Sequence, residues 1–230
     1  MFLAVGIALH IAQRSGLRSS GQGCLRSGIF AGLMGIYCLG LTTSSYGQMT
    51  AVNSNAIVAN LNGAGYLSLP TLNGLGGDLT VEGWIFLKSY SAWARILDLG
   101  MGQRDNNILL YFDGTTGTPM FDVYPAGPNA NPARRLIATS PIPLNTWTHL
   151  AGVVQSDGTM ILYVNGVAVV TDTGTSLPLT TNRTSNFIGK SNWSTDPLWM
   201  GPLRMCGSGI LPAPKQKSRR PCPSVPSPVR

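Results

Sequence analysis

Cysteine is missing from the whole central part of this chain. The four cysteines are Cys24, Cys38, Cys206 and Cys222, so residues 48–203 contain none. A disulfide framework and a Cys-x-x-Cys zinc site are therefore excluded from this part. A fold here must be stabilised by apolar burial and by backbone pairing, and the segment is long enough to bury a core.

Acidic residues are few, with nine Asp and Glu against 16 Lys and Arg, which gives a formal net charge of +7. The excess lies at the two ends. Residues 1–47 contain three basic residues and residues 204–230 contain six, with no acidic residue in either segment. Between them there are seven basic and nine acidic residues and no basic stripe interleaved with aromatic residues. We therefore expect no nucleic-acid partner.

Residues 1–47 contain no apolar run long enough to span a bilayer. The run at 29–41 is about 13 residues long, whereas a membrane-spanning helix needs roughly 20. Small residues, Ser45 and Gly47, precede a predicted cleavage site before Gln48. The pattern predicts a signal peptide with a long basic start, and a mature protein that is secreted or at the cell surface, without a stable membrane span. A buried core helix is the alternative for the apolar run.

The clearest strand signal lies at residues 145–172. Residues 147–154 and 159–164 are rich in Val, Ile, Leu, Tyr and Thr, which suit a pleated sheet. A Gln-Ser-Asp-Gly turn joins them, and Asn165-Gly166 then forms the two-residue signal of a type I′ hairpin. Both alternating sets of residues are apolar, which predicts central strands between two covering layers.

The remaining strands are also short, and no amphipathic helical stretch of useful length separates them. This spacing predicts an all-β protein, an antiparallel β-sandwich of the jelly-roll type. Besides the central hairpins, strands are expected at residues 56–61, 66–69, 79–87, 94–99, 107–112, 120–124, 134–139 and 187–191.

Six motifs occur in an order that carries a family resemblance. They are YLSLP at 66–70, LTVEGW at 79–84, WARILDLG at 93–100, NTWTHLA at 145–151, LYVNG at 162–166 and IGKSNW at 188–193. Together they resemble laminin G-like domains of the concanavalin A-like lectin/glucanase jelly-roll superfamily, over about residues 54–203. The resemblance implies one domain, assigned to residues 48–203, with a binding role outside the cytoplasm.

Catalysis is not expected, although the resembled superfamily includes glucanases. Retaining hydrolysis needs two carboxylates about 5 Å apart, and the related glucanases carry them on one strand. Glu82 is the only glutamate of the chain and has no second acid on its strand. His149 is the only histidine of residues 48–203, and its Trp-Thr-His context is typical of a packed strand residue.

The resemblance also implies a calcium ion, because many laminin G-like domains hold one at the rim of the sandwich through oxygen ligands. The candidate ligands are Asp98, Asp105, Asn106, Asn107 and Asp157. The alternative is that these are ordinary turn residues, since Asp and Asn favour loops.

Four aromatic residues near predicted loops could stack on a sugar ring: Trp93, Tyr124, Trp193 and Trp199. Aromatic rings suit the flat faces of pyranose sugars, so these are the candidate ligand-binding residues. A role in the core or in anchoring loops is the alternative.

The character of the chain changes after Leu203. Residues 204–230 are basic and rich in proline, where the resembled domains place their closing strand. Another reading frame of this stretch permits Asp-Val-Arg-Ile-Trp-Asn-Ile, which is the expected closing pattern. We therefore predict a frameshifted, disordered tail and a sandwich truncated at its last strand, with an open edge beside residues 56–61. A genuine disordered basic linker is the alternative.

The sequence thus predicts a secreted, non-catalytic module that binds a glycan or an extracellular protein surface. Two alternatives stay open. One is a structural or adhesive module of a larger surface protein truncated by the frameshift, and the other is a degenerate glycoside hydrolase.

Overall fold

The computed structural model describes residues 6–7, 11–13, 39–40, 42–44, 48–53, 56–63, 65–124, 134–174 and 177–206. Every regular element in these ranges is a strand, and the strands lie in antiparallel sheets. No helix among them is long and apolar enough to cross a membrane. The predicted all-β antiparallel sandwich is confirmed.

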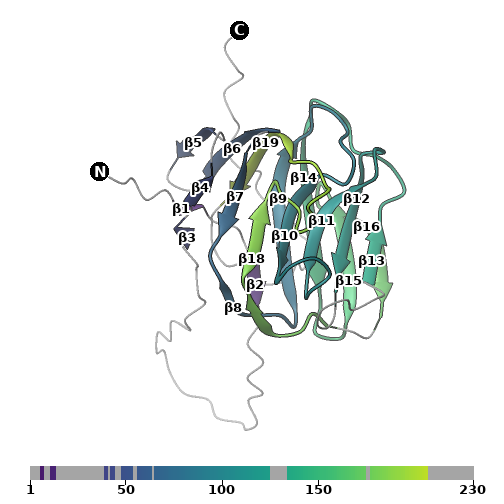
Figure 1. Cartoon of the computed structure of the whole chain (residues 1–230). Coiled ribbons are helices and arrows are strands. Elements are labelled where there is room, and N and C mark those ends of the chain that lie inside the picture. Colours follow the sequence, from purple (N-terminus) through teal and green to yellow (C-terminus); the bar gives the residue numbers. More distant parts are fainter. Residues whose placement is uncertain are drawn as a thin grey trace, which may run out of the picture.

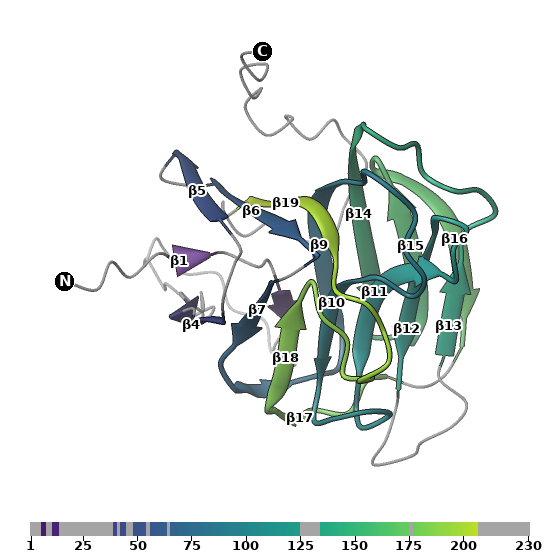
Figure 2. The same cartoon turned by 45° about the horizontal axis from the view of Figure 1, so that its top comes forward.

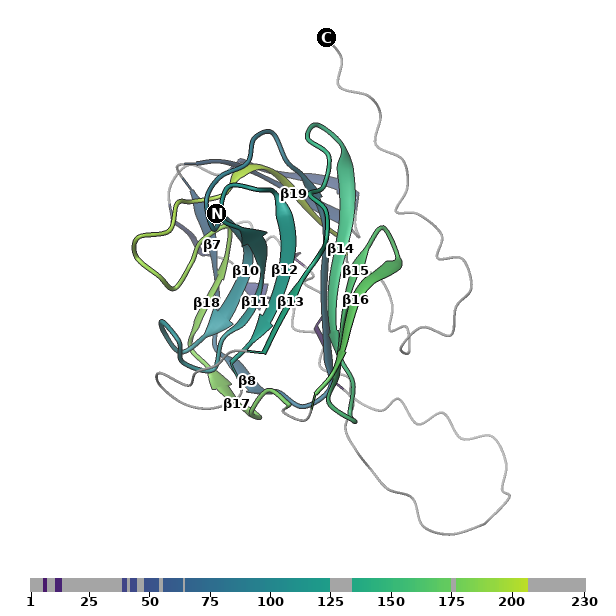
Figure 3. The ribbon, with the colours of Figure 1, turned by 90° about the vertical axis from the view of Figure 1, so that its right-hand side faces the viewer.

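Two large sheets form the layers of the sandwich, which Figure 3 shows side by side. The seven-stranded sheet runs β13 (Arg134–Ile137), β12 (Thr118–Val123), β11 (Ile108–Asp113), β10 (Arg95–Gly100), β18 (Ser185–Ile188), β7 (Tyr66–Leu69) and β4 (Thr42–Ser44). The eight-stranded sheet runs β16 (Val167–Thr173), β15 (Thr159–Val164), β14 (Trp147–Val154), β9 (Leu79–Phe86), β19 (Met200–Cys206), β6 (Ala56–Asn62) and β5 (Gln48–Asn53), and β2 (Ile11–Gln13) pairs with β9 (Figure 1). Two small sheets pair β17 (Thr181–Arg183) with β8 (Leu72–Leu75) and β1 (Gly6–Ile7) with β3 (Leu39–Gly40).

Alternation along the strands places the core between the two layers. In β9, Leu79, Val81 and Ile85 are buried, while Trp84 and Phe86 between and after them are only partly covered. Successive side chains of a strand point to opposite faces of the sheet, so one set enters the core and the other lies outside. The same period of two operates in the facing sheet.

Trp199 belongs to this core. It is fully buried, its ring stacks on Phe112 at a centroid distance of 5.7 Å, and its indole N–H donates to the carbonyl of Gly201 at 3.0 Å. Its selection as a ligand-binding residue is therefore wrong. The sequence could not distinguish Trp199 from the exposed tryptophans, because it also lies in a loop. Only the structure shows that its side chain points into the core.

The central hairpins have the predicted strands and turns. Asn165 and Gly166 both have positive φ, 50° and 80°, as a type I′ turn requires. The expectation that all three strands are central is wrong for β16, which is the edge of the eight-stranded sheet and is largely exposed. Of the three, β14 is the strand that is buried along most of its length.

The closing position of the eight-stranded sheet is filled. β19 pairs with β6 from Met200 to Cys206 and with β9 at Leu203 and Arg204 (Figure 2). Since β6 also pairs with β5, the open edge expected beside it is not found. Strand pairing uses main-chain groups, so three residues beyond Leu203 can continue the ladder whatever their side chains. The frameshift itself stays a prediction, and residues 207–230 lie outside the described residues.

Other boundaries differ in detail. The strand expected at 187–191 is shifted, because β18 ends at Ile188 and Gly189, with a φ of 77°, turns the chain into a loop. Strands β8 and β17 were not predicted. The signal peptide and its cleavage site also stay predictions, since most of residues 1–47 lies outside the described ranges.

Candidate functional site

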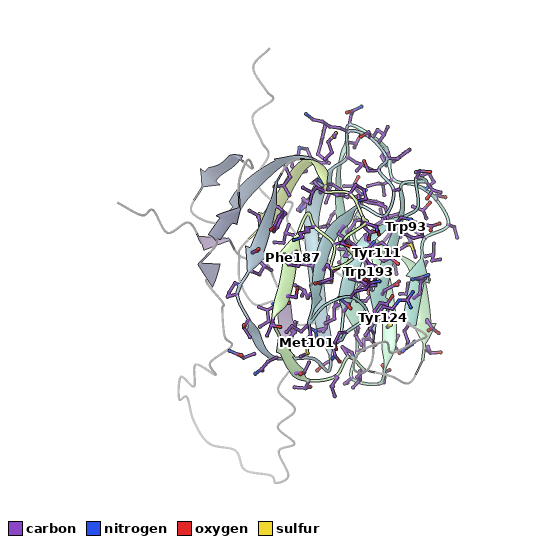
Figure 4. All side chains as sticks on the ribbon, in the orientation of Figure 1. Trp93, Met101, Tyr111, Tyr124, Phe187 and Trp193 are labelled. Carbon is purple, nitrogen blue, oxygen red and sulfur yellow. The ribbon has the colours of Figure 1, made fainter. Side chains whose placement is uncertain are left out.

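A second apolar cluster lies on the outer face of the seven-stranded sheet. Leu109, Tyr111, Met120 and Tyr124 form it, and Trp193 packs against it. The alternate residues of the same strands belong to the core, so these side chains point away from the core. In Figure 4, Trp93, Tyr111, Trp193 and Tyr124 gather over β10–β12, while Phe187 and Met101 lie farther away. The sheet therefore carries an aromatic surface on its outer side.

A cavity of about 290 Å³ is hollowed into this surface. Its walls combine aromatic rings with charged groups: Trp93, Tyr111, Tyr124, Trp193, Arg95, Arg104, Arg135, Asp196 and Leu109. We call it the outer-face pocket. Flat apolar rings with a few convergent polar groups are typical of small-ligand sites, which usually enclose about 300–1,000 Å³. Its volume is just below that range, which suits a small unit or the end of a chain.

Arg95 fills the floor of the outer-face pocket. Its guanidinium carbon lies 4.2 Å from the ring centroid of Tyr111 and 5.2 Å from that of Trp193. Its Nη1 donates to the carbonyl of Trp93 at 3.0 Å, and its Nη2 pairs with Asp196 at 2.9 Å. One buried cation thus connects three aromatic residues and an acid, which holds the aromatic walls in place.

A second charged group is built into the sheet beside it. Asp122 is fully buried and accepts hydrogen bonds from Arg135 Nε and Nη2, at 3.0 and 2.8 Å to Oδ2, and from the hydroxyl of Tyr111 at 2.9 Å. Burial raises the pKa of Asp122, and the bonds from Arg135 oppose this. Burial likewise raises the pKa of Tyr111, so that it stays a neutral donor.

Asp98 holds the loop that carries Trp193. Its Oδ2 accepts the backbone N–H of Asn192 at 2.7 Å, and its Oδ1 accepts the side-chain amides of Asn192 and Asn107 at 2.7 and 2.9 Å. Complete burial raises the pKa of Asp98 to about 6, although these bonds lower it. Directly before Asn192, the hydroxyl of Ser191 donates to Asp196 at 2.8 Å, which fixes the turn.

Arg183 holds a second loop, residues 101–107, which joins β10 to β11. It is fully buried, and its guanidinium donates to the carbonyls of Asn106 at 2.8 Å, of Leu179 at 3.3 Å and of Leu75. Burial lowers the pKa of Arg183 to about 10. In this loop Arg104 and Asn106 have positive φ, 58° and 56°, which is uncommon for residues other than glycine. The loop is thus held in one conformation that brings Arg104 to the pocket.

A family model described as the concanavalin A-like lectin/glucanases superfamily matches residues 61–205, more than half of the chain. The chain belongs to this superfamily. Comparison with curated proteins gives no match.

Among solved structures, the chain is similar to domain 4 of AbnA, a GH43 extracellular arabinanase of Geobacillus stearothermophilus, solved with arabinotriose. The TM-score is 0.54 at 22% identity, covering 73% of this chain and 81% of that one. It is also similar to the receptor-binding domain of botulinum neurotoxin mosaic serotype C/D, with a TM-score of 0.52, 12% identity and coverage of 74% and 42%. The binding domain of Paraclostridial Mosquitocidal Protein 1 is similar with a TM-score of 0.50 at 12% identity, covering 74% of this chain and 43% of that one. This chain thus spans less than half of each toxin chain, and at these identities the likeness shows a shared fold.

Three of the four aromatic residues selected from the sequence meet at the outer-face pocket of this superfamily member. Trp93 is the most exposed of them at 40%, and Tyr124 and Trp193 lie 5.9 Å apart between ring centroids. Whether they bind a ligand stays a prediction. The sequence analysis missed the charged residues Arg95, Arg104, Arg135, Asp122 and Asp196. A signal existed only for Asp122, which alternates with the core residues Phe121 and Val123 of the same strand.

Of the five calcium candidates, four lie together and one lies apart. Hydrogen bonds join Asp98, Asp105, Asn106 and Asn107. Asp157 lies in the β14–β15 turn of the other sheet, where its Oδ1 accepts the N–H of Thr159 at 2.9 Å. Asp98 already accepts three N–H groups. The Oδ1 of Asn106 is buried without a partner, but the Arg183 cation bonds to the carbonyl of the same residue. Within the described residues no three His, Cys, Asp or Glu side chains group as a metal site. Calcium binding stays a prediction, and we derive no function through it; a thermal shift with calcium against chelator tests the prediction.

Glu82 and His149 lie on the outer face of the eight-stranded sheet, on β9 and β14. The nearest oxygen and nitrogen of the pair are 3.5 Å apart, and each side chain is less than one-fifth exposed. His149 also contacts the ring of Trp84, its cross-strand partner, at 5.3 Å. The pair therefore lies on a different sheet from the outer-face pocket.

Proposed function

We propose that this domain is a non-catalytic carbohydrate-binding module of a secreted or cell-surface protein, and that the outer-face pocket holds the end of a glycan chain. The observation that carries the proposal is the convergence of Trp93, Tyr124 and Trp193 on one cavity whose polar groups are held by buried bonds.

The pocket has the two features that sugar recognition needs. Trp93 offers an exposed ring face at the rim, and a sugar ring can stack there through its axial C–H groups. Arg135, whose side chain is 43% exposed, and Asp196 supply a donor and an acceptor for hydroxyl groups. Because Asp122 and Arg95 hold these groups before a ligand arrives, little side-chain freedom is lost on binding.

The state of the acids supports binding without catalysis. A retaining glycosidase needs one carboxyl free to donate a proton and another free to attack the sugar. In the outer-face pocket Asp122 is engaged by Arg135 and Tyr111, and Asp196 is engaged by Arg95. Glu82, the only glutamate, is on the other sheet.

The first ligands to test follow from the fold. The similar domain of the arabinanase is solved with arabinotriose, so arabino-oligosaccharides belong in the panel beside other neutral and acidic oligosaccharides. The panel should be screened on a glycan array with the full chain, and the hits titrated by calorimetry.

Trp93→Ala tests the site. We expect it to weaken binding of the array hits by at least about tenfold, because the stacking face is lost, with little change in melting temperature since the ring is exposed. The matched control is Trp147→Ala, which removes an aromatic ring from the outer face of the other sheet and should leave affinity unchanged. Equal affinity of both variants, or loss in both, would place the binding site elsewhere.

A further inference from the structure

The three arginines of the outer-face pocket are not equivalent. Arg95 is 4% exposed and pairs with Asp196, and Arg135 makes a bidentate pair with Asp122. In each case a carboxylate of the protein already neutralises the guanidinium. These two cations therefore organise the pocket and are not available as unpaired charges for a ligand.

Arg104 has no such partner. Its side chain is exposed and lines the pocket, yet it makes no hydrogen bond or ion pair with any residue that the structure describes. The neighbouring acid, Asp105, does not line the pocket, and its Oδ1 accepts an N–H from Asn106 at 2.7 Å. Arg104 thus brings five donors and a full positive charge to the rim without an internal use for them.

The loop beneath Arg104 is not a loose surface segment. Met101 N–H donates to the carbonyl of Asp105 at 2.9 Å, and Asp105 N–H donates to Asn107 Oδ1 at 2.8 Å. Arg183 bonds to the carbonyl of Asn106 from the buried side. Arg104 itself has a φ of 58°, which is unfavourable for a residue with a side chain. The backbone is therefore fixed, although the guanidinium is free.

The acidic residues near the pocket do not neutralise the positive charge of Arg104 at the pocket surface. Asp98 and Asp122 are both fully buried, and the side chain of Asp196 is 12% exposed and paired with Arg95. An incoming ligand therefore meets the exposed guanidinium of Arg104 and the exposed part of Arg135, but no unpaired carboxylate among the pocket walls.

We infer that the glycan bound here carries a carboxylate, as in a hexuronic or sialic acid unit, and that Arg104 receives this group while the sugar ring lies against Trp93. The inference rests on the proposed function and names the class of its ligand. A planar guanidinium matches a carboxylate with two parallel N–H···O bonds, which a neutral sugar hydroxyl cannot accept in the same way. Arg104 is then a specificity-determining residue.

The experiment compares matched ligand pairs on the full chain by calorimetry. The pairs are oligogalacturonate against galacto-oligosaccharide of the same length, and sialyllactose against lactose. We expect the acidic member of at least one pair to bind about tenfold more tightly, and this preference to shrink as salt is raised from about 0.05 to 0.5 M. Arg104→Gln should remove the preference while retaining the affinity for the neutral member.

Two controls make the result specific. Arg104→Lys keeps the charge without the bidentate fork and should retain only part of the preference. Lys88→Gln removes one exposed positive charge outside the pocket and should leave the preference unchanged. Circular dichroism of each variant checks that the fold is retained.

The outcomes separate the two proposals. If the wild type binds both members of each pair equally, or if Arg104→Gln weakens both equally, the acidic ligand is wrong and the glycan module stands. If the wild type binds no oligosaccharide of the panel, both proposals fail. If Lys88→Gln reduces the preference as much as Arg104→Gln, the effect is one of net charge, and the role of Arg104 is overturned.

Discussion

The two large sheets each carry aromatic residues on their outer faces, but they are assembled in different ways. On the eight-stranded sheet Trp84 faces His149 and Phe86 faces Trp147, and each pair is a direct cross-strand partnership between β9 and β14. We call this set the cross-strand stripe. On the seven-stranded sheet the outer-face pocket takes Trp93 and Trp193 from loops 100 residues apart in sequence.

The difference lies in what holds the rings. Register alone brings the stripe together, because residues opposite each other on one face of an antiparallel pair are neighbours. The pocket instead depends on buried polar groups, chiefly Asp98 and Arg95, whose partners lie in other segments. A buried charge that loses its partners is costly, whereas a partly exposed strand pair is not. Substitutions should therefore have larger effects on the pocket side than on the stripe side.

The largest effect is expected from Asp98→Ala. It leaves three N–H groups of Asn192 and Asn107 without their acceptor, so we expect a loss of about 3–5 kcal/mol in the free energy of unfolding, together with loss of glycan affinity. The matched change on the eight-stranded sheet is Glu82→Ala, beside the cross-strand stripe. It should lower stability by about 1 kcal/mol or less, because Glu82 is partly exposed. Urea denaturation measures both, and equal losses would contradict the comparison.

The next effect is a pH dependence. The folded-state pKa of Asp98 is about 6, above its ordinary 3.8, so the folded chain binds this proton more tightly than the unfolded chain does. The resulting stabilisation is complete below about pH 4 and is lost as the pH rises through about 6. The stability advantage of the wild type over Asp98→Asn should shrink by up to about 3 kcal/mol between pH 4 and pH 7. Denaturation at both pH values checks this, and a constant difference would show that Asp98 does not titrate in this range.

The smallest effect compares two tyrosines. Tyr111→Phe removes the hydroxyl that donates to buried Asp122 and should lower stability by about 1–2 kcal/mol. Tyr163→Phe, on the outer face of the eight-stranded sheet, should change stability by less than about 0.5 kcal/mol, because its hydroxyl has no hydrogen bond to a described residue. Chemical denaturation of the two variants in parallel makes the measurement, and a larger loss for Tyr163→Phe would reverse the proposed difference.

Much of the strand pattern could be predicted, because it depends on local alternation and turn residues. Residues 66–69, 147–154 and 159–164 form the strands that the sequence indicated, and Asn165-Gly166 forms the turn. Apolar alternation does not report position within a sheet, which is why β16 is an edge although its residues resemble those of a central strand.

The candidate site was only partly accessible from the sequence. Trp93, Tyr124 and Trp193 were selected as aromatic residues near loops, but Trp199 met the same criterion and lies in the core. The charged half of the pocket was missed for two reasons. Asp122 and Arg135 are direct partners on neighbouring strands, but their register is known only from the structure. Arg95 meets Asp196 across about 100 residues, and no spacing rule reaches that far.

By itself, the sequence determined the class of fold, the family and many of the strand positions, because each follows from local pattern or from motif order. The tertiary structure decided which aromatic residues reach the surface and which cations stay unpaired. Both depend on how loops cross the outer face of the seven-stranded sheet and on where Asp98 and Arg183 anchor them. Arg95 is buried and paired with Asp196, whereas Arg104 stays exposed at the pocket. This difference exists only once the loops have packed together.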